Sequence, residues 1–402
     1  MKQLNYLLFL LVCLVTSIPS FAQFTINGRS VIYDKVSDTY MVSIPENAFG
    51  TDYEASIALD ATAGWSNLSI EGTDIADNYT FKQVEGNKIY KIHAQEGDKE
   101  INTQLTFTFL PLLVMEGTFG YSYAQGNISL LSPEAAEPTN SFAKVKWRGG
   151  TTNTADKHKR NYKIKTLNEK GKKQEISLLG MREDNNWILD AGQIDLFRLR
   201  NRIATEIWND FATKPYYASK EPKTKSGVAG KVVEVILNNE YRGIYSLTEA
   251  MDRKELKLKK YDDKNQEFHG HLWKVSSWDK AQFWEIDKDY DNTQETWHAF
   301  ETKYPDIEDV NPTDYSPLYE AIDFVVNSND ETFKKEVGDY FDIPVLIDYQ
   351  LFQETLKPVD NNGKNMYWGI YDVAESQKLT LAIWDLDASV GQDWHCSTPL
   401  HP

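Results

Sequence analysis

The sequence predicts an α+β protein, in which an all-β, sandwich-like N-terminal domain precedes a domain that mixes strands with helices. Three observations support this. Short segments that alternate apolar and polar residues, separated by Gly, Asn and Asp clusters, follow one another over residues 24–132. Residues 131–140 are rich in Pro, Ala and Glu, which is typical of a linker. Beyond them, apolar residues recur at three- and four-residue spacing, as in amphipathic helices.

Length and charge limit the classes of function. The chain has 402 residues, with 41% hydrophobic and 26% charged residues, as expected of a folded protein large enough to bury a core. Asp and Glu number 60 against 43 Lys and Arg, so the formal net charge is −17. An acidic surface repels phosphate backbones, and no nucleic-acid partner is expected.

Residues 1–22 have the features of a cleaved signal peptide. Lys2 gives a basic start, residues 7–15 are an apolar run, and Ser20-Phe21-Ala22 precedes Gln23 as a small-x-small cleavage site. No later stretch reaches the roughly 18 apolar residues of a spanning helix, so no transmembrane segment is expected. The mature protein is therefore predicted to be secreted, to the periplasm or to the cell surface and beyond.

Residues 23–132 are predicted to form the β-sandwich-like accessory domain, with a linker at 133–142 and a second domain at 143–402. Strands are expected at 40–44, 53–59, 88–93 and 104–109. No acid pair, nucleophile or metal-ligand spacing stands out in this domain. It is a candidate for contact with a cell surface or a glycan.

The elements of the second domain follow from local patterns. Strands are expected at residues 143–147, 161–166 and 379–384, and helices at 196–211 and 343–356, with Asp195 as the N-cap of the first helix. Strands at 232–237 and 244–247 flank Asn238 and Asn239. Asn tolerates the left-handed conformation of tight turns, so this pattern predicts a hairpin.

Several polar groups of this domain suit phosphoryl transfer from a nucleotide. Such a reaction needs a flexible turn over the phosphates, a cation beside them and oxygen ligands for magnesium. The Gly149-Gly150 turn could offer backbone N–H groups. Lys163 and Lys165 alternate with apolar residues on the next strand and face the same side, and Glu206 on the helix could hold one of them.

Carboxylate and amide side chains follow later elements of the same domain. Asp360 and Asn365 stand five residues apart on a loop after a helix, where the acid could position an accepting hydroxyl. Asp385 and Asp387 come directly after an apolar strand. Hard oxygen ligands of this kind suit magnesium.

Taken together, these blocks resemble the spore coat protein H (CotH) kinase family over about residues 143–395. The resemblance lies in blocks that occur in family order: Arg148-Gly149-Gly150, Lys159-Arg160-Asn161-Tyr162-Lys163-Ile164-Lys165, Leu178-Leu179-Gly180, Asn186-Trp187-Ile188-Leu189, Arg200-Asn201, Val235 to Tyr245, Thr248-Glu249 and Trp384-Asp385-Leu386-Asp387. Each block alone is common, whereas their combination is specific. The hairpin has Asn238-Asn239 where the family commonly has Asn-Gly.

The resemblance implies an atypical protein-kinase-like fold that binds ATP with Mg²⁺ or Mn²⁺ and phosphorylates a protein substrate. Its N-lobe would span about 143–252 and its C-lobe about 253–402. Family members usually continue further than Pro402, so either this C-lobe is shortened or the given sequence is incomplete. The implied roles follow by position. Asp360 would be catalytic, and Asn365, Asp385 and Asp387 would hold metal. The nucleotide would meet Arg148, Gly149, Gly150, Lys163 or Lys165, Glu206 and Glu249.

Two other classes of function stay open. One is a non-catalytic, kinase-shaped binding or scaffold module at the cell surface, which the early end of the sequence and the scarcity of ATP outside the cytoplasm favour. The other is a glycan-binding or carbohydrate-active protein, suggested by export, acidity and the 11 Trp and 22 Tyr. ATP–magnesium binding separates the glycan class from the others, and phosphate transfer separates the kinase from the scaffold.

Overall fold

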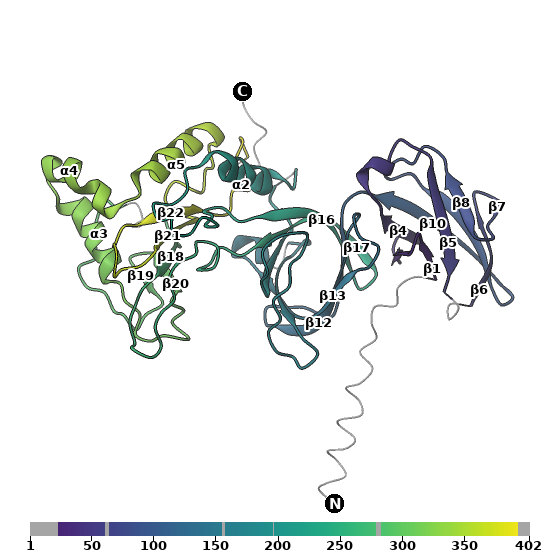
Figure 1. Cartoon of the computed structure of the whole chain (residues 1–402), viewed down its shortest axis with the longest axis horizontal. Helices are drawn as coiled ribbons and strands as arrows, with labels where there is room; N and C mark the ends of the chain where they lie inside the picture. Colours follow the sequence, from purple (N-terminus) through teal and green to yellow (C-terminus); the bar gives the residue numbers. More distant parts are fainter. Residues whose placement is uncertain (1–22, 61–63, 155–156, 196, 279–282, 393–402) are drawn as a thin grey trace, which may run out of the picture. The chain divides into compact units, whose positions relative to one another are not determined.

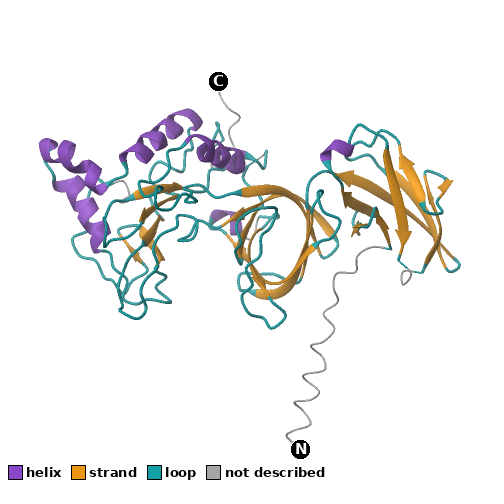
Figure 2. Ribbon diagram, viewed as in Figure 1, coloured by secondary structure: helices purple, strands orange, loops and turns teal. Residues whose placement is uncertain are grey.

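The computed structural model describes residues 23–60, 64–154, 157–195, 197–278 and 283–392, and the predicted signal peptide lies outside these ranges (Figure 1). The chain divides into two compact units. The first holds residues 1–147, 163–185 and 232–245, and the second holds 148–162, 186–231 and 246–402. The described residues are mostly β, and their α-helices all belong to the second unit (Figure 2). The predicted β-rich character is thus confirmed.

Two sheets form the N-terminal sandwich. One sheet has the order β2-β1-β5-β8, and the other has the order β3-β4-β10-β9-β6-β7. The strands are β1 (Phe24–Ile26), β2 (Arg29–Ser30), β3 (Ile32–Asp34), β4 (Thr39–Ser43), β5 (Tyr53–Leu59), β6 (Trp65–Ile70), β7 (Thr73–Asp74), β8 (Asn78–Phe81), β9 (Tyr90–Glu96) and β10 (Lys99–Thr108). A short 3-10 helix, η1 (Glu46–Ala48), follows β4.

The sandwich core is apolar because inward-facing residues alternate along these strands. Phe24, Phe81 and Phe107 are fully buried at its centre. The ring of Phe24 meets Tyr40 at a tilt, and those of Phe81 and Phe107 meet Tyr90 edge-on. The predicted strands at 40–44, 53–59, 88–93 and 104–109 all overlap observed strands.

A closed seven-stranded β-barrel follows, which the sequence did not lead us to expect. Its order is β11-β12-β13-β14-β15-β17-β16, and β11 and β16 pair in parallel to close it. The strands are β11 (Leu112–Glu116), β12 (Ala124–Leu131), β13 (Thr139–Arg148), β14 (Asn161–Leu167), β15 (Asn186–Asp190), β16 (Gly230–Leu237) and β17 (Glu240–Glu249). β11, β12 and the start of β13 precede residue 143, where the second domain was expected to begin.

The turn between β16 and β17 confirms the predicted hairpin. Asn238 and Asn239 have φ values of 52° and 60°, which place both in the left-handed region that a type I′ turn requires. Asn238 also accepts a 3.0 Å hydrogen bond from the N–H of Gly117 and donates one of 2.9 Å to its carbonyl. Asn239 therefore adopts the left-handed conformation at the position where the resembled family commonly has Gly.

The second unit is built on a five-stranded sheet with the order β19-β20-β18-β21-β22. Its strands are β18 (His271–Val275), β19 (Thr296–Trp297), β20 (Phe300–Tyr304), β21 (Met366–Ile370) and β22 (Thr380–Ile383). The helices are α2 (Arg200–Phe211), α3 (Ser316–Asn327), α4 (Asp330–Tyr340) and α5 (Ile343–Leu356), with a 3-10 turn, η2 (Thr151–Asn153).

Helix α5 has the bounds that the sequence predicts. It buries Val345, Tyr349 and Phe352, which recur at four- and three-residue spacing. The ring of Phe352 lies 5.4 Å from that of Trp208 on α2, centroid to centroid. The helix ends at Leu356, and the C-cap Lys357 has a left-handed φ of 47°, so the chain turns directly into the loop that contains Asp360.

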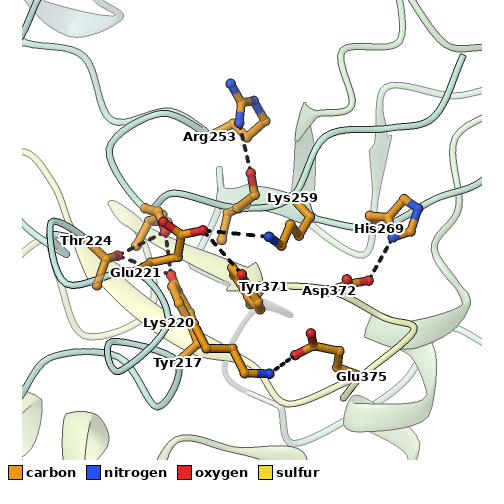
Figure 3. A network of polar contacts seen from close by, with 12 residues as sticks. Tyr217, Lys220, Glu221, Thr224, Arg253, Lys259, His269, Tyr371, Asp372 and Glu375 are labelled. Atoms are coloured by element: carbon orange, nitrogen blue, oxygen red, sulfur yellow. Dashed lines mark hydrogen bonds and ion pairs between the residues drawn. The ribbon is translucent and has the colours of Figure 1, made fainter.

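A polar network fastens residues 217–224 to the segments around residues 256 and 371 (Figure 3). The hydroxyls of Tyr217 and Thr224 donate to the carbonyl of Leu256, at 2.7 and 2.9 Å. Tyr371 donates to Glu221 at 3.3 Å. These bonds hold the chain that leaves α2 against the sheet of the same unit.

Candidate functional site

The loop after α5 brings together the predicted Asp–Asn pair. The side-chain amide of Asn365 donates a 2.8 Å hydrogen bond to Oδ2 of Asp360, and Nζ of Lys364 lies 3.0 Å from the same oxygen. Oδ1 accepts from the indole N–H of Trp278 at 3.1 Å. Asn365 adopts a left-handed φ of 55°, a conformation that Asn tolerates better than most residues. Spacing alone could not show that these side chains meet.

Asn361 ties this loop to the loop after β22. Its side chain is fully buried, and its amide donates to the carbonyls of Asn365 at 3.1 Å and Trp384 at 2.6 Å. The carbonyl of Asn361 accepts from Tyr349 and Gln353 of α5, the latter at 3.0 Å. The helix, the Asp360 loop and the residues preceding Asp385 therefore form one hydrogen-bonded assembly.

The carboxylate of Asp385 lies near both acidic and basic side chains. Burial raises its pKa above the ordinary value, and the negative charges of Asp190 and Asp360 act in the same direction. The cations of Arg148 and Lys274 oppose this shift in pKa. A carboxylate placed among other carboxylates in this way favours a bound cation.

Asp387 lies two residues further along the same loop. Burial raises its pKa well above the ordinary value, and the charge of Asp385 adds to the shift. Both side chains are half-buried. Two of the three predicted metal ligands thus share one electrostatic environment.

Asn201, in the first turn of α2, joins β15 to the Asp385 loop. Its amide donates to Oδ2 of Asp190 at 2.8 Å, and its Oδ1 accepts from the N–H of Leu386 at 3.1 Å. Arg148 lies nearby, with its guanidinium carbon 5.5 Å from the ring centre of Trp384. These side chains line a cavity of about 20 Å³, which is the size of a water site.

The glycine turn is fixed by its own geometry. Gly149 has a φ of 111°, and a Cβ atom there would lie 2.3 Å from Oγ1 of Thr152, so no other residue fits without a shift. Asn161 donates to Oγ1 of Thr152 at 3.2 Å and accepts from the N–H of Ala191 at 2.6 Å. Gly150 meets no atom within 4 Å at its Cβ position, so its backbone is open to an approaching group.

The two strand lysines face the same side, as predicted. Lys163 and Lys165 are both half-buried on β14, and the residues between and beside them are buried. Nζ of Lys165 lies 4.9 Å from the ring centre of Tyr123, a cation–π contact that Lys146 also makes at 4.9 Å. Their contact with a nucleotide stays a prediction.

Glu206 pairs with a residue of its own helix. Its carboxylate lies 3.2 Å from Nε of Arg202, one turn away, and the Glu206 side chain is 57% exposed. Arg202 is buried and donates to the carbonyl of Val228 at 2.9 Å. Glu249 is fully buried and accepts from the N–H of Ala229 at 3.3 Å.

Sequence reasoning missed Asp190, Arg202 and Lys274. Asp190 ends the buried strand β15, so the argument that selected Asp385 after β22 would have found it. Lys274 lies between buried residues on β18, and burial lowers its pKa, an effect that the charge of Asp385 opposes. No signal in the sequence places that lysine beside Asp385.

The described residues contain no group of three or more His, Cys, Asp and Glu side chains placed to hold a metal ion. Magnesium at nucleotide sites is bound by one or two carboxylates together with phosphates and water, and a full protein cage is not needed. The donor set of Asn365, Asp385 and Asp387 is chemically suited to that mode. Within the described part of the chain, no helix has the length and apolar character that crossing a bilayer requires.

Comparison with known proteins gives a family match over residues 145–400. The model of the CotH kinase protein family matches this range, which is more than half of the chain and contains every candidate residue described above. No curated protein matches the chain. The family match confirms the resemblance found in the sequence, and the chain therefore belongs to the CotH kinase protein family.

Proposed function

We propose that this protein is an exported atypical protein kinase that transfers the γ-phosphate of ATP to a hydroxyl of a protein substrate. The contact between Asp360 and Asn365, with Asn361 tying their loop to the one that carries Asp385, is the observation that carries the proposal. Asp360, Asn365 and Asp385 supply two carboxylates and an amide, and all three lie within the range of the family match. These are the groups that phosphoryl transfer requires.

In this proposal Asp360 accepts a hydrogen bond from the substrate hydroxyl and orients it. Asn365 and Asp385 hold Mg²⁺ or Mn²⁺, with Asp387 as a further ligand. The cation would neutralise negative charge on the phosphates. Burial raises the pKa of Asp385 and the neighbouring carboxylates add to the shift, so a cation there would relieve their mutual repulsion.

The nucleotide phosphates are proposed to meet Arg148, the Gly149-Gly150 turn and Lys163 or Lys165. Arg148 already lies close enough to Asp385 for its charge to oppose the rise in pKa that burial causes at that carboxyl. Glu206 and Glu249 complete the proposed nucleotide set. Residues 143–252 would act as the N-lobe of the kinase domain and 253–402 as its C-lobe.

The signal peptide proposed for residues 1–22 would deliver the protein to the periplasm or the cell surface, where its substrate protein would also be found. The N-terminal sandwich is proposed to act as an accessory domain. Export separates the enzyme from cytoplasmic ATP, so the nucleotide would have to be released or carried into the same compartment.

The test is transfer of labelled γ-phosphate from ATP to a generic protein acceptor by the chain from Gln23 onward, with Mg²⁺ or Mn²⁺. Asp360→Ala should abolish transfer. Asp339→Ala, which changes an exposed side chain of α4, is the matched control and should leave it unchanged. Transfer that persists in folded Asp360→Ala would refute the assignment of the catalytic residue.

A non-catalytic binding module is the second candidate, and one observation favours it. Both carboxylate oxygens of Asp360 are engaged, Oδ1 by Trp278 and Oδ2 by Asn365 and Lys364. A substrate hydroxyl would have to displace one of these partners. Binding of ATP with Mg²⁺ but no transfer in the same assay would support this module over the kinase.

A further inference from the structure

Residues of the N-terminal sandwich, with Asn239 of the β16–β17 turn, line a cavity of about 480 Å³ that has no part in the proposed kinase site. Aromatic, acidic and amide side chains line it, among them Tyr33, Asp38, Tyr40, Trp65, Glu96 and Asn102. All belong to the first unit. The volume lies within the roughly 300–1,000 Å³ of small-molecule sites.

The aromatic wall is held in place by packing. Trp65 stacks on Phe24 with ring centres 6.0 Å apart and planes inclined by 27°, and it meets Tyr40 edge-on at 5.8 Å. Tyr33 in turn lies 5.0 Å from Tyr40, centre to centre. Because the neighbouring rings fix Trp65 and Tyr33, a ligand that stacks on them loses little side-chain entropy of the protein.

The polar wall is equally ordered. Oδ1 of Asp38 accepts from the hydroxyls of Tyr33 at 2.8 Å and Thr103 at 3.1 Å, which leaves Oδ2 without a partner among the described residues. Oδ1 of Asn102 lies 3.2 Å from a ring nitrogen of His93, so the amide N–H groups of Asn102 stay available. Glu96 is exposed and contributes a further carboxylate.

We propose that this cavity is a binding site for a neutral saccharide. The C–H face of a sugar ring is apolar and packs on an aromatic ring, while each hydroxyl both donates and accepts hydrogen bonds. The cavity offers acceptors in Asp38 and Glu96 and donors in Asn102 and the indole N–H of Trp65. The aromatic rings match the apolar C–H face of a sugar, and the mixed donors and acceptors match its hydroxyls.

Charge selects a neutral sugar over an acidic one. Asp38, Glu96 and Glu100 line the cavity against a single cation, Lys99, so an anionic ligand would be repelled. A quaternary ammonium ion is also a poorer fit. It binds to ring faces alone and cannot use the donors, and Tyr40, only 6% exposed, has little surface left to enclose a cation.

The test is calorimetric titration of the chain from Gln23 onward with cellohexaose, xylohexaose, mannohexaose and maltohexaose as probes. At least one should bind, and binding should change the fluorescence of Trp65. Glu96→Gln and Asn102→Ala, which alter exposed side chains and should leave the fold intact, should each weaken binding by about tenfold. Trp65→Ala should remove it.

Trp284→Ala is the matched control, because Trp284 is 66% exposed in the other unit and should leave binding unchanged. The proposal is overturned if none of the four saccharides binds, if the Glu96 and Asn102 variants bind as well as the parent, or if tetramethylammonium binds in their place. No step of the test reads phosphate transfer, so its outcome is independent of the proposed kinase activity.

Discussion

The buried amide of Asn361 donates a 2.6 Å hydrogen bond to the carbonyl of Trp384, which precedes Asp385 in the chain. The two residues come from loops that follow different elements, α5 and β22. Since the same amide also donates to the carbonyl of Asn365, it sets the spacing between the proposed catalytic loop and the proposed metal loop. Asn361 itself is not a candidate to touch substrate.

Asn361→Ala should therefore loosen both loops. It removes two hydrogen bonds and leaves two buried carbonyls without this donor, so we expect a loss of about 2–4 kcal/mol in the free energy of unfolding. Urea denaturation measures it. Asn327→Ala, which removes one bond of 2.8 Å to Asp323 on the surface of α3, is the control and should cost less than about 1 kcal/mol. Equal losses would mean that Asn361 does not join the loops.

Gly149→Ala should strain the turn that is proposed to cover the phosphates. Ala would have to adopt a φ of 111° and to place its Cβ 2.3 Å from Oγ1 of Thr152. We expect a destabilisation of about 2–4 kcal/mol in thermal or urea unfolding. Gly338→Ala on α4 meets no atom within 4 Å and should be neutral or stabilising, since Ala favours a helix. A stable Gly149→Ala variant would show that the turn can rearrange.

The local elements of this protein were predictable, because their signals are local. Residues 343–356 form α5 within the predicted bounds, and the Asn238-Asn239 turn has the conformation that its residues favour. The start of the first helix of the second domain was predicted less accurately. Asp195 was predicted to cap it, whereas the helix begins at Arg200, whose N–H donates to the Asp195 carboxylate at 2.7 Å. The prediction that Asp195 is the N-cap is therefore wrong: Leu199 occupies that position without a side-chain cap hydrogen bond, while Asp195 accepts from the N–H of the first helical residue.

The barrel and the composition of the site were not predictable in the same way. Closing the barrel depends on parallel pairing of β11 with β16, about 120 residues apart, and no local pattern encodes a partner at that distance. Likewise Asp190 and Lys274 reach the surroundings of Asp385 only through the fold. The five-residue spacing identified Asp360 and Asn365 as candidates, but it could not show that their side chains meet or that Asn365 has a left-handed backbone.

Arg202 and Glu206 should differ sharply when each is replaced. Arg202 is 4% exposed and donates to the carbonyl of Val228, so Arg202→Met should cost about 2–4 kcal/mol in urea unfolding. Glu206 is 57% exposed, and Glu206→Gln should cost less than about 1 kcal/mol. If Glu206 also supports nucleotide binding, the second variant should lose phosphate transfer while it keeps its stability. Unchanged transfer would remove Glu206 from the proposed nucleotide set.

Lys159 should make stability depend on alkaline pH. Burial, with a smaller effect of Arg198, lowers its pKa to about 8 from an ordinary value of 10.5. Between these values the unfolded chain binds more protons at this site than the folded protein does. The free energy of unfolding contributed by Lys159 should therefore rise with pH from about 8 to about 10, by at most about 1.4 kcal/mol per pH unit.

Urea unfolding of the parent and of Lys159→Met at pH 7, 8, 9 and 10 measures this contribution as the change in their difference with pH. The substitution also removes the 3.1 Å bond from Nζ to the carbonyl of Ala191, which adds a constant offset and does not change the slope. Parallel curves for the two proteins would mean that Lys159 titrates at its ordinary pKa.

Asp385→Asn should separate metal binding from folding. The change keeps the size of a half-buried side chain and removes its charge, so the fold should persist, while a carboxylate ligand becomes a weaker amide ligand. We expect the affinity for Mn²⁺ in the presence of ATP, measured by electron paramagnetic resonance of the free ion, to fall about tenfold or more. Asp339→Asn on α4 is the control with an exposed carboxylate. This readout does not depend on catalysis. A non-catalytic nucleotide-binding module should therefore also lose Mn²⁺ affinity on this substitution. A protein that holds no metal at Asp385 should lose none.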